Sequence, residues 1–237
     1  NNALTANTSA HDNTAVGHES LSANTTGAQN TGLGHRSLQS NTTGSQNTAV
    51  GRHSLNANTT ADNNTAVGYH ALLSNTTGAR NTAVGAYALD AASTASDNTA
   101  FGYDASGAIT TGDLNVAIGK GAMGSNTVGD RNVAIGANAL YSYNPSSNED
   151  GYNVAIGLNA LNVTTTGNNN TAVGGKALEA NTTGTSNVAV GAYALDAITT
   201  GSNSVAIGYE ALSAHTAAQP SVAVGRGALK SNVTGQY

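Results

Sequence analysis

The stretch that decides the fold is a nine-residue phrase, Asn64-Thr65-Ala66-Val67-Gly68-Tyr69-His70-Ala71-Leu72. Variants of the phrase recur along the chain, each with one shared glycine that we call the anchor. The thirteen anchors are Gly17, Gly34, Gly51, Gly68, Gly85, Gly102, Gly119, Gly136, Gly157, Gly174, Gly191, Gly208 and Gly225. Consecutive anchors are 17 residues apart, except for 21 residues between Gly136 and Gly157. So strict a period predicts a stack of equivalent supersecondary units.

The residues before each anchor predict a short β-strand. The position three residues before the anchor is Thr or Val, and the position directly before it is Val, Leu, Ile or Phe. The residue between them is Ala, with Gly32 as the exception. Residues two apart share one face of a strand. We therefore expect the branched columns to point into the coil. The Ala column is then expected to face outward, where neighbouring chains could approach closely.

The residues after each anchor complete one coil. Leu stands four residues after the anchor in eleven coils, and Ser106 and Met123 replace it in the other two. We interpret this column as a second inward row. The corner that follows has β-turn chemistry, as in the stretch Asn24-Thr25-Thr26-Gly27. An Asn column before each strand is expected to stack as a ladder of hydrogen bonds.

These patterns favour one fold class over the helical alternative. Glycine and β-branched residues recur every few positions, so no apolar stripe of helical period survives. The sequence therefore predicts an all-β protein, a parallel β-roll or β-solenoid of about 13 coils with a 17-residue period. We expect residues 1–237 to form a single repeat domain, with an insertion loop at residues 141–152.

Composition excludes several kinds of partner. Charged residues make up 9% of the chain and the formal net charge is −5, whereas nucleic-acid partners demand a dense basic face. The chain contains no cysteine, so disulfides and thiolate metal sites are excluded. No apolar run approaches the length of a membrane span. We therefore expect no nucleic-acid partner and no membrane insertion by this segment.

The repeats also resemble known families. The stretch Asn203-Ser204-Val205-Ala206-Ile207-Gly208 resembles the repeat of trimeric autotransporter adhesin heads of the YadA type. The alternation of turn and strand phrases over residues 75–85 is similar to repeats of phage and bacterial tail-fibre proteins. The resemblance implies a left-handed parallel β-roll in a side-by-side homotrimer. It also implies an extracellular place, on a cell surface or in the fibre of a phage-like particle. The period here is longer than that of the adhesin heads, which indicates a larger coil.

The thinness of the predicted coil also favours an assembly. One coil buries few large side chains, while ordering its residues costs conformational entropy. A second burial surface, supplied by neighbouring chains, would offset that cost. The resemblance supplies the number of chains, three.

The histidines and acidic residues show no pattern typical of a metal site or a catalytic site. His18 and His35 share one column, and His53 and His70 share the next. No third ligand recurs beside either pair, so we predict no metal site and no cofactor. The thirteen acidic residues are scattered, and neither a nucleophile elbow nor a phosphate loop occurs. We predict no catalytic residues and a protein that is not an enzyme.

The function expected from these observations is that of a structural or adhesive fibre module, an adhesin head or a tail-fibre shaft presenting a repetitive surface. Two alternatives remain open, an ice-binding β-solenoid that uses stacked threonines and a polysaccharide-binding tailspike. The threonine columns begin at Thr25 and Thr26, which are adjacent and would point opposite ways in an extended segment. The dispersed carboxylates weigh against a tailspike.

The break in the period is the one candidate binding site. Four extra residues lie within 141–152, a stretch that holds three of the nine tyrosines of the chain. Tyrosine combines a flat apolar face with a polar tip. We predict that Tyr141, Tyr143 and Tyr152 form a contact surface for a host-surface glycan, a matrix protein or a neighbouring chain. A plain surface loop is the alternative.

Overall fold

A computed structural model describes residues 2–234. The chain divides into two compact units, Asn1–Leu114 (unit 1) and Asn115–Tyr237 (unit 2), which are described separately. Each unit is a parallel β-solenoid with a 17-residue period, so the predicted fold class is confirmed. No helix within residues 2–234 is long and apolar enough to span a bilayer. The prediction of a single domain stays a prediction.

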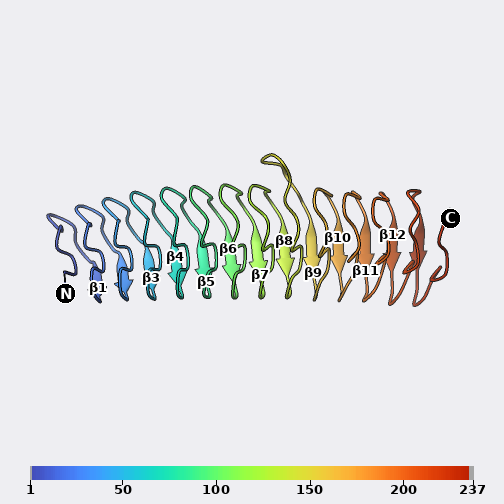
Figure 1. The fold of residues 1–237 in the computed structure, drawn as a ribbon, viewed down its shortest axis with the longest axis horizontal. Coiled ribbons are helices and arrows are strands. Elements are labelled where there is room, and N and C mark those ends of the chain that lie inside the picture. The colour runs from blue at the N-terminus through green and yellow to red at the C-terminus, as the bar shows by residue number, and fades with distance from the viewer. Residues whose placement is uncertain (1, 235–237) are drawn as a thin grey trace. The chain divides into compact units, whose positions relative to one another are not determined.

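Each coil contributes one three-residue strand, as Figure 1 shows. Unit 1 contains β1 (Thr14–Val16), β2 (Thr31–Leu33), β3 (Thr48–Val50), β4 (Thr65–Val67), β5 (Thr82–Val84) and β6 (Thr99–Phe101). Unit 2 contains β7 (Val116–Ile118), β8 (Val133–Ile135), β9 (Val154–Ile156), β10 (Thr171–Val173), β11 (Val188–Val190), β12 (Val205–Ile207) and β13 (Val222–Val224). Within each unit, consecutive strands pair in parallel and in register.

Backbone hydrogen bonds join each coil to its neighbours. In β4 the Thr65 amide donates to the Asn81 carbonyl at 2.8 Å, and the Gly68 amide donates to the Val50 carbonyl at 2.8 Å. The register is kept across the four-residue insertion, because Val133 of β8 pairs with Val154 of β9. The extra residues are therefore extruded from the stack, as Figure 1 shows between β8 and β9.

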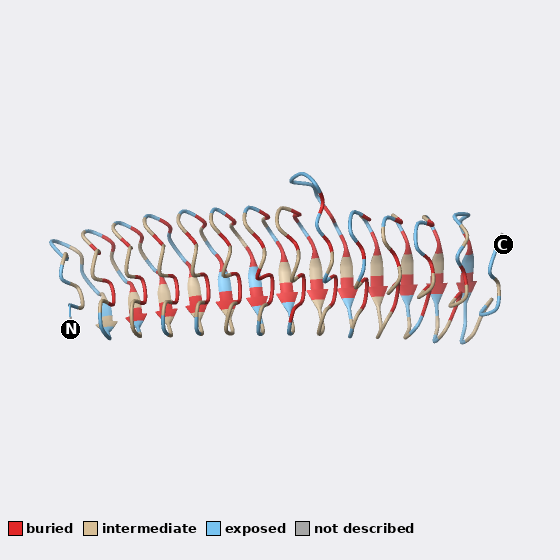
Figure 2. Cartoon of the chain, viewed as in Figure 1, coloured by how far each residue is buried: buried red, intermediate tan, exposed pale blue. Residues whose placement is uncertain are grey.

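The predicted orientation of the strands is wrong. The central alanines, such as Ala49, Ala66 and Ala83, are buried, while the branched residues on either side are exposed or half-buried. Figure 2 shows this on the arrows after β1, whose centres are red and whose ends are tan or blue. Alanine, not valine, lines the interior of the coil.

The width of the coil explains this orientation. The leucines after each anchor, such as Leu38 and Leu55, are fully buried, and their backbones adopt a left-handed conformation with φ of 50°. A Cβ atom built on Gly32 at a strand centre would lie 2.5 Å from Ser20 Oγ and 3.4 Å from Leu21 Cδ1. With leucine and serine rows this close, the interior accepts little more than a methyl group from the strand.

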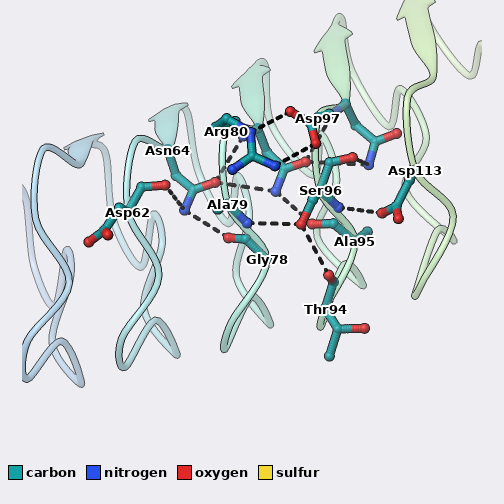
Figure 3. A network of polar contacts seen from close by, with 12 residues as sticks. Asp62, Asn64, Gly78, Ala79, Arg80, Thr94, Ala95, Ser96, Asp97 and Asp113 are labelled. Carbon is teal, nitrogen blue, oxygen red and sulfur yellow. Dashed lines mark hydrogen bonds and ion pairs between the residues drawn. The ribbon is translucent and has the colours of Figure 1, made fainter.

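Two asparagine ladders stabilise the corners. In the ladder before the strands, Asn64 Nδ2 donates to the Gly78 carbonyl at 2.9 Å and Asn64 Oδ1 accepts from the Asn81 amide at 3.0 Å. Figure 3 shows these contacts beside the ion pair of Arg80 with Asp97. The predicted Asn column is therefore confirmed as a ladder of hydrogen bonds between coils.

The second ladder is formed by coils in which asparagine stands seven residues after the anchor. Asn58 Nδ2 donates to Asn41 Oδ1 at 2.7 Å, and Asn75 Nδ2 donates to Asn58 Oδ1 at 3.0 Å. The next residue of this column is Ala92, and Asn75 Oδ1 is buried without a partner. The ladder therefore ends at Ala92, which has no side-chain amide that could donate to Asn75 Oδ1.

The anchor glycine provides the first test of the coil geometry. Gly174 has φ of +137°, and a Cβ atom there would lie 2.5 Å from the Gly191 carbonyl carbon. Its neighbour Gly175 would meet nothing within 4 Å. We expect Gly174→Ala to lower the free energy of unfolding by about 3 kcal/mol or more, because it adds both backbone strain and a backbone clash. Gly175→Ala should change it by about 0.5 kcal/mol or less. Urea unfolding of the two variants measures the difference, and equal effects would contradict the packing described.

A second prediction concerns the buried asparagines. Asn58→Ala removes two hydrogen bonds within the ladder and leaves Asn41 Oδ1 unsatisfied in the interior. We expect a loss of about 2–3 kcal/mol in the free energy of unfolding. The exposed Thr60 of the same corner is the control, since Thr60→Ala should have little effect. Thermal unfolding followed by circular dichroism is the measurement.

Candidate functional site

The insertion loop does not present its three tyrosines on one surface. Tyr143 is completely buried and occupies the column of the second asparagine ladder, seven residues after its anchor. Its hydroxyl donates to Asn168 Oδ1 at 2.8 Å. Burial, followed by the negative charges of Glu149, Asp130 and Asp150, raises the pKa of Tyr143 far above its usual value. The prediction that Tyr143 belongs to a contact surface is therefore wrong, because this side chain fills the interior at the base of the loop.

Tyr141 and Tyr152 remain accessible. Tyr141 is 39% exposed, and its ring lies close to Gly121 and Gly124. Tyr152 is 52% exposed, and its hydroxyl donates to Asp150 Oδ2 at 3.0 Å. That hydrogen bond, followed by desolvation, raises the pKa of Tyr152. A contact surface made by the loop is therefore limited to these two rings and the polar groups beside them.

Polar contacts hold the loop against the preceding coil. Asp150 forms an ion pair with Arg131 and a parallel bridge with Asp130. The Asp130 amide donates to the Glu149 carbonyl at 2.9 Å. Pro145 is buried beside the ring of Tyr143. The loop is thus anchored at both of its ends.

A third prediction separates the buried tyrosine from the exposed one. Tyr143→Ala should lower the free energy of unfolding by about 3–5 kcal/mol, because it leaves a cavity that the surrounding side chains do not fill. Tyr143→Phe should lower it by about 1–2 kcal/mol, because Asn168 loses its hydrogen bond. Tyr141→Ala is the control and should stay within about 1 kcal/mol of the native protein. Guanidinium unfolding tests the order, and an equal loss in Tyr141→Ala and Tyr143→Ala would contradict the burial described.

Each unit has one accessible face on its sheet. We call it the branched strand face; it consists of the first and last residues of β1–β6 in unit 1 and of β7–β13 in unit 2. In unit 1 Phe101 is 56% exposed, and in unit 2 Ile207 is 40% exposed. The first position is threonine in all six strands of unit 1, but valine in every strand of unit 2 except β10. Each unit therefore displays a row of branched side chains with few charges, a surface typical of protein–protein contacts.

A ladder of aromatic rings runs beside the anchors in unit 1. Ring centroids of His18 and His35 are 5.3 Å apart, those of His35 and His53 are 5.3 Å apart, and those of His53 and His70 are 5.4 Å apart. Tyr87 continues the series, with its ring centroid 5.6 Å from that of His70. We call His18, His35, His53 and His70 the histidine ladder.

The backbone explains why residues from two sequence columns meet. The His53 amide donates to the His35 carbonyl at 2.9 Å, although His35 stands one residue after its anchor and His53 stands two. This one-residue stagger of the backbone brings the second residue of one coil beside the first residue of the preceding coil. The sequence columns had separated these residues into two unrelated pairs, so the continuous ladder was missed.

Three charged groups, Glu19, Arg36 and Arg52, lie beside the histidine ladder. Glu19 accepts a hydrogen bond from Arg36 at 2.7 Å, which lowers the pKa of the carboxyl group. Burial, followed by the positive charge of Arg52, lowers the pKa of His53 and of His70. The ring planes of His18 and His35 differ by only 10°, so their in-plane lone pairs do not converge on one ion. No group of three or more metal-ligating residues within residues 2–234 could hold a metal ion.

Other carboxylates are also perturbed. Burial, followed by the charge of Asp104, raises the pKa of Asp90, and burial raises the pKa of Asp104 itself. In unit 2, burial likewise raises the pKa of Asp196, whose Oδ1 atom is buried without a hydrogen-bond partner. The prediction that the protein has no catalytic residue stays a prediction.

Comparison with known proteins gave no relative: the chain matches no protein-family model, no curated protein and no solved structure. The resemblance to adhesin-head and tail-fibre repeats therefore rests on the repeated phrases alone.

Proposed function

We propose that the chain is a non-enzymatic structural and adhesive fibre module, working outside the cell as a side-by-side homotrimer. The observation that carries the proposal is the branched strand face, which in each unit is a row of branched side chains outside an interior lined by alanine. A chain that displays its largest branched residues outward gains further stability when a neighbour covers them.

The size of the face supports an assembly of chains. In unit 2, residues such as Ile118, Ile156 and Ile207 are 36–40% exposed. Each such side chain leaves roughly 50 Å² accessible, so the seven strands of this unit together offer on the order of 600 Å². A stable interface buries about 800 Å² on each partner. The face of one unit thus offers about three quarters of that area, and residues beside the face would have to supply the rest.

The outward orientation also changes how neighbouring chains would approach. The sequence led us to expect contact through the small alanine column, but alanine is buried in strands β3 to β12. In the proposed trimer the chains pack through valine and isoleucine in unit 2, and through threonine and valine in unit 1. The number three comes from the resemblance to the adhesin heads.

The adhesive part of the proposal rests on the insertion loop. Tyr141 and Tyr152 are exposed there, and Glu149 is exposed beside them. These groups suit contact with a glycan of a host surface or with a matrix protein, through stacking on the rings and hydrogen bonds to the polar groups. A trimer would display three copies of the loop, so that weak single contacts add up.

Ice binding is less well supported by the contacts of the threonines. The hydroxyl of Thr25 donates to the Thr42 carbonyl at 3.0 Å, and that of Thr42 donates to the Thr59 carbonyl at 3.0 Å. Hydroxyls already bonded to the next coil are less able to order water. A thermal-hysteresis measurement on the purified protein distinguishes the two functions.

The fourth prediction tests the assembly. At micromolar concentration the native protein should scatter light as a particle with three times the mass of one chain. Val190→Lys and Ile207→Lys place charges on the branched strand face and should each lower the particle mass, because burying an unpaired ammonium group is costly. Thr183→Lys, at an exposed corner position, is the matched control and should remain trimeric. A folded native monomer at that concentration would overturn the proposed assembly.

The fifth prediction tests the loop. Deleting residues 146–149 restores the 17-residue period, and the shortened protein should fold, because β8 and β9 already pair in register. We expect it to lose binding to immobilised host glycans and matrix proteins. Unchanged binding by a folded, shortened protein would show that residues 146–149, and the loop conformation that they support, take no part in adhesion.

A further inference from the structure

The histidine ladder of unit 1 is held at fixed spacing by the backbone. The Arg36 amide donates to the His18 carbonyl at 2.9 Å, the His53 amide to the His35 carbonyl at 2.9 Å, and the His70 amide to the Arg52 carbonyl at 3.2 Å. These bonds are part of the stacking between coils. The backbone positions that carry the rings therefore keep the spacing of the coils.

One carboxylate and two arginines face the ladder, and burial followed by the charge of Arg52 lowers the pKa of His53 and of His70. Glu19 is the acidic group beside it. Its carboxylate is paired with Arg36 at 2.7 Å, accepts a hydrogen bond from Gln39 at 2.9 Å, and lies 3.8 Å from His18 Nδ1. Arg52 lies over the ring of Tyr69, which stacks on His70 with ring centroids 3.8 Å apart. Tyr69 and Tyr87 are the remaining titratable groups in contact with the ladder, and desolvation raises the pKa of Tyr87.

Protonation of the ladder would therefore place like charges side by side. Each imidazolium would lie about one coil spacing from the next, with two arginines nearby and one carboxylate that is already engaged. Like charges at this distance repel, and separation of the coils relieves the repulsion. Few large apolar contacts resist such separation, because each coil buries a single leucine and small residues beside it.

We propose that the histidine ladder makes the coils from residue 18 to residue 72 acid-labile, so that they loosen as the pH falls from about 7 to about 5. The corresponding coils of unit 2 between β9 and β12 contain no histidine and stay stacked. The inference concerns one chain and does not depend on the proposed trimer, because the ladder lies beside the anchors and not on the branched strand face.

The direction of the pH dependence follows from the folded state. The pKa values of His53 and His70 lie below those of the unfolded chain, so the unfolded state binds more protons as the pH falls. The contribution of these residues to stability is complete above about pH 6.5 and is lost as the pH falls through the folded-state values.

Hydrogen exchange of the full chain tests the proposal. Amide exchange followed by mass spectrometry at about pH 7.5 and about pH 5, corrected for intrinsic rates, should show roughly tenfold or greater loss of protection over residues 18–72. Residues 154–207 are the internal reference and should keep their protection. The comparison needs no variant, and equal loss in both stretches would overturn the proposal.

Variants then assign the effect to the ladder. In the double variant His35→Gln/His53→Gln, the acid-induced loss of protection over residues 18–72 should fall to the level of the reference stretch. His11→Gln is the matched control, because His11 is exposed and lies outside the ladder, and it should behave as the native protein does. An unchanged acid response in a folded double variant would show that other groups cause the loosening.

Discussion

The bonding of each coil to the equivalent residues of the next coil is the interaction on which each unit depends. Strand amides, corner amides and asparagine side chains all find partners one period away, as Asn64 does with Asn81. The anchor glycine permits this contact, because a side chain at its place would meet the backbone of the neighbouring coil. Stability is therefore a sum of contacts between adjacent coils, as in other repeat proteins. A change in one coil is expected to act mainly on its two neighbours.

The thin interior of the coil determines what the surface looks like. A buried leucine in left-handed conformation, such as Leu55, leaves space for only a methyl group from the strand opposite. The branched residues must then face outward, where β-branched side chains still favour the extended backbone. The apolar face that supports the proposed assembly is thus a consequence of how the coil packs, and it would exist whatever partner covers it.

The same constraint explains the two irregular features of the chain. At the insertion, Tyr143 fills the column elsewhere occupied by asparagine, and the extra residues leave the stack without disturbing the strands. In the histidine ladder, the backbone holds four histidines at the spacing of the coils, so charges on neighbouring rings would repel one another. Both features show a repeat that tolerates variation at its corners while the strand register stays fixed.

The sequence by itself determined the period, the strand positions, the corner turns and the asparagine ladder before the strands, because each depends on residues that recur 17 positions apart. It could not decide which face of the strand is inside. Alternation shows that Thr65 and Val67 share a face and Ala66 takes the other. Only the tertiary structure showed that the interior fits alanine, since that depends on the conformation of leucines elsewhere in the coil. Tyr143 was misplaced for the same reason, because its column is defined by packing. The histidine ladder emerged only in three dimensions, since a one-residue stagger between coils joins residues that the sequence columns keep apart.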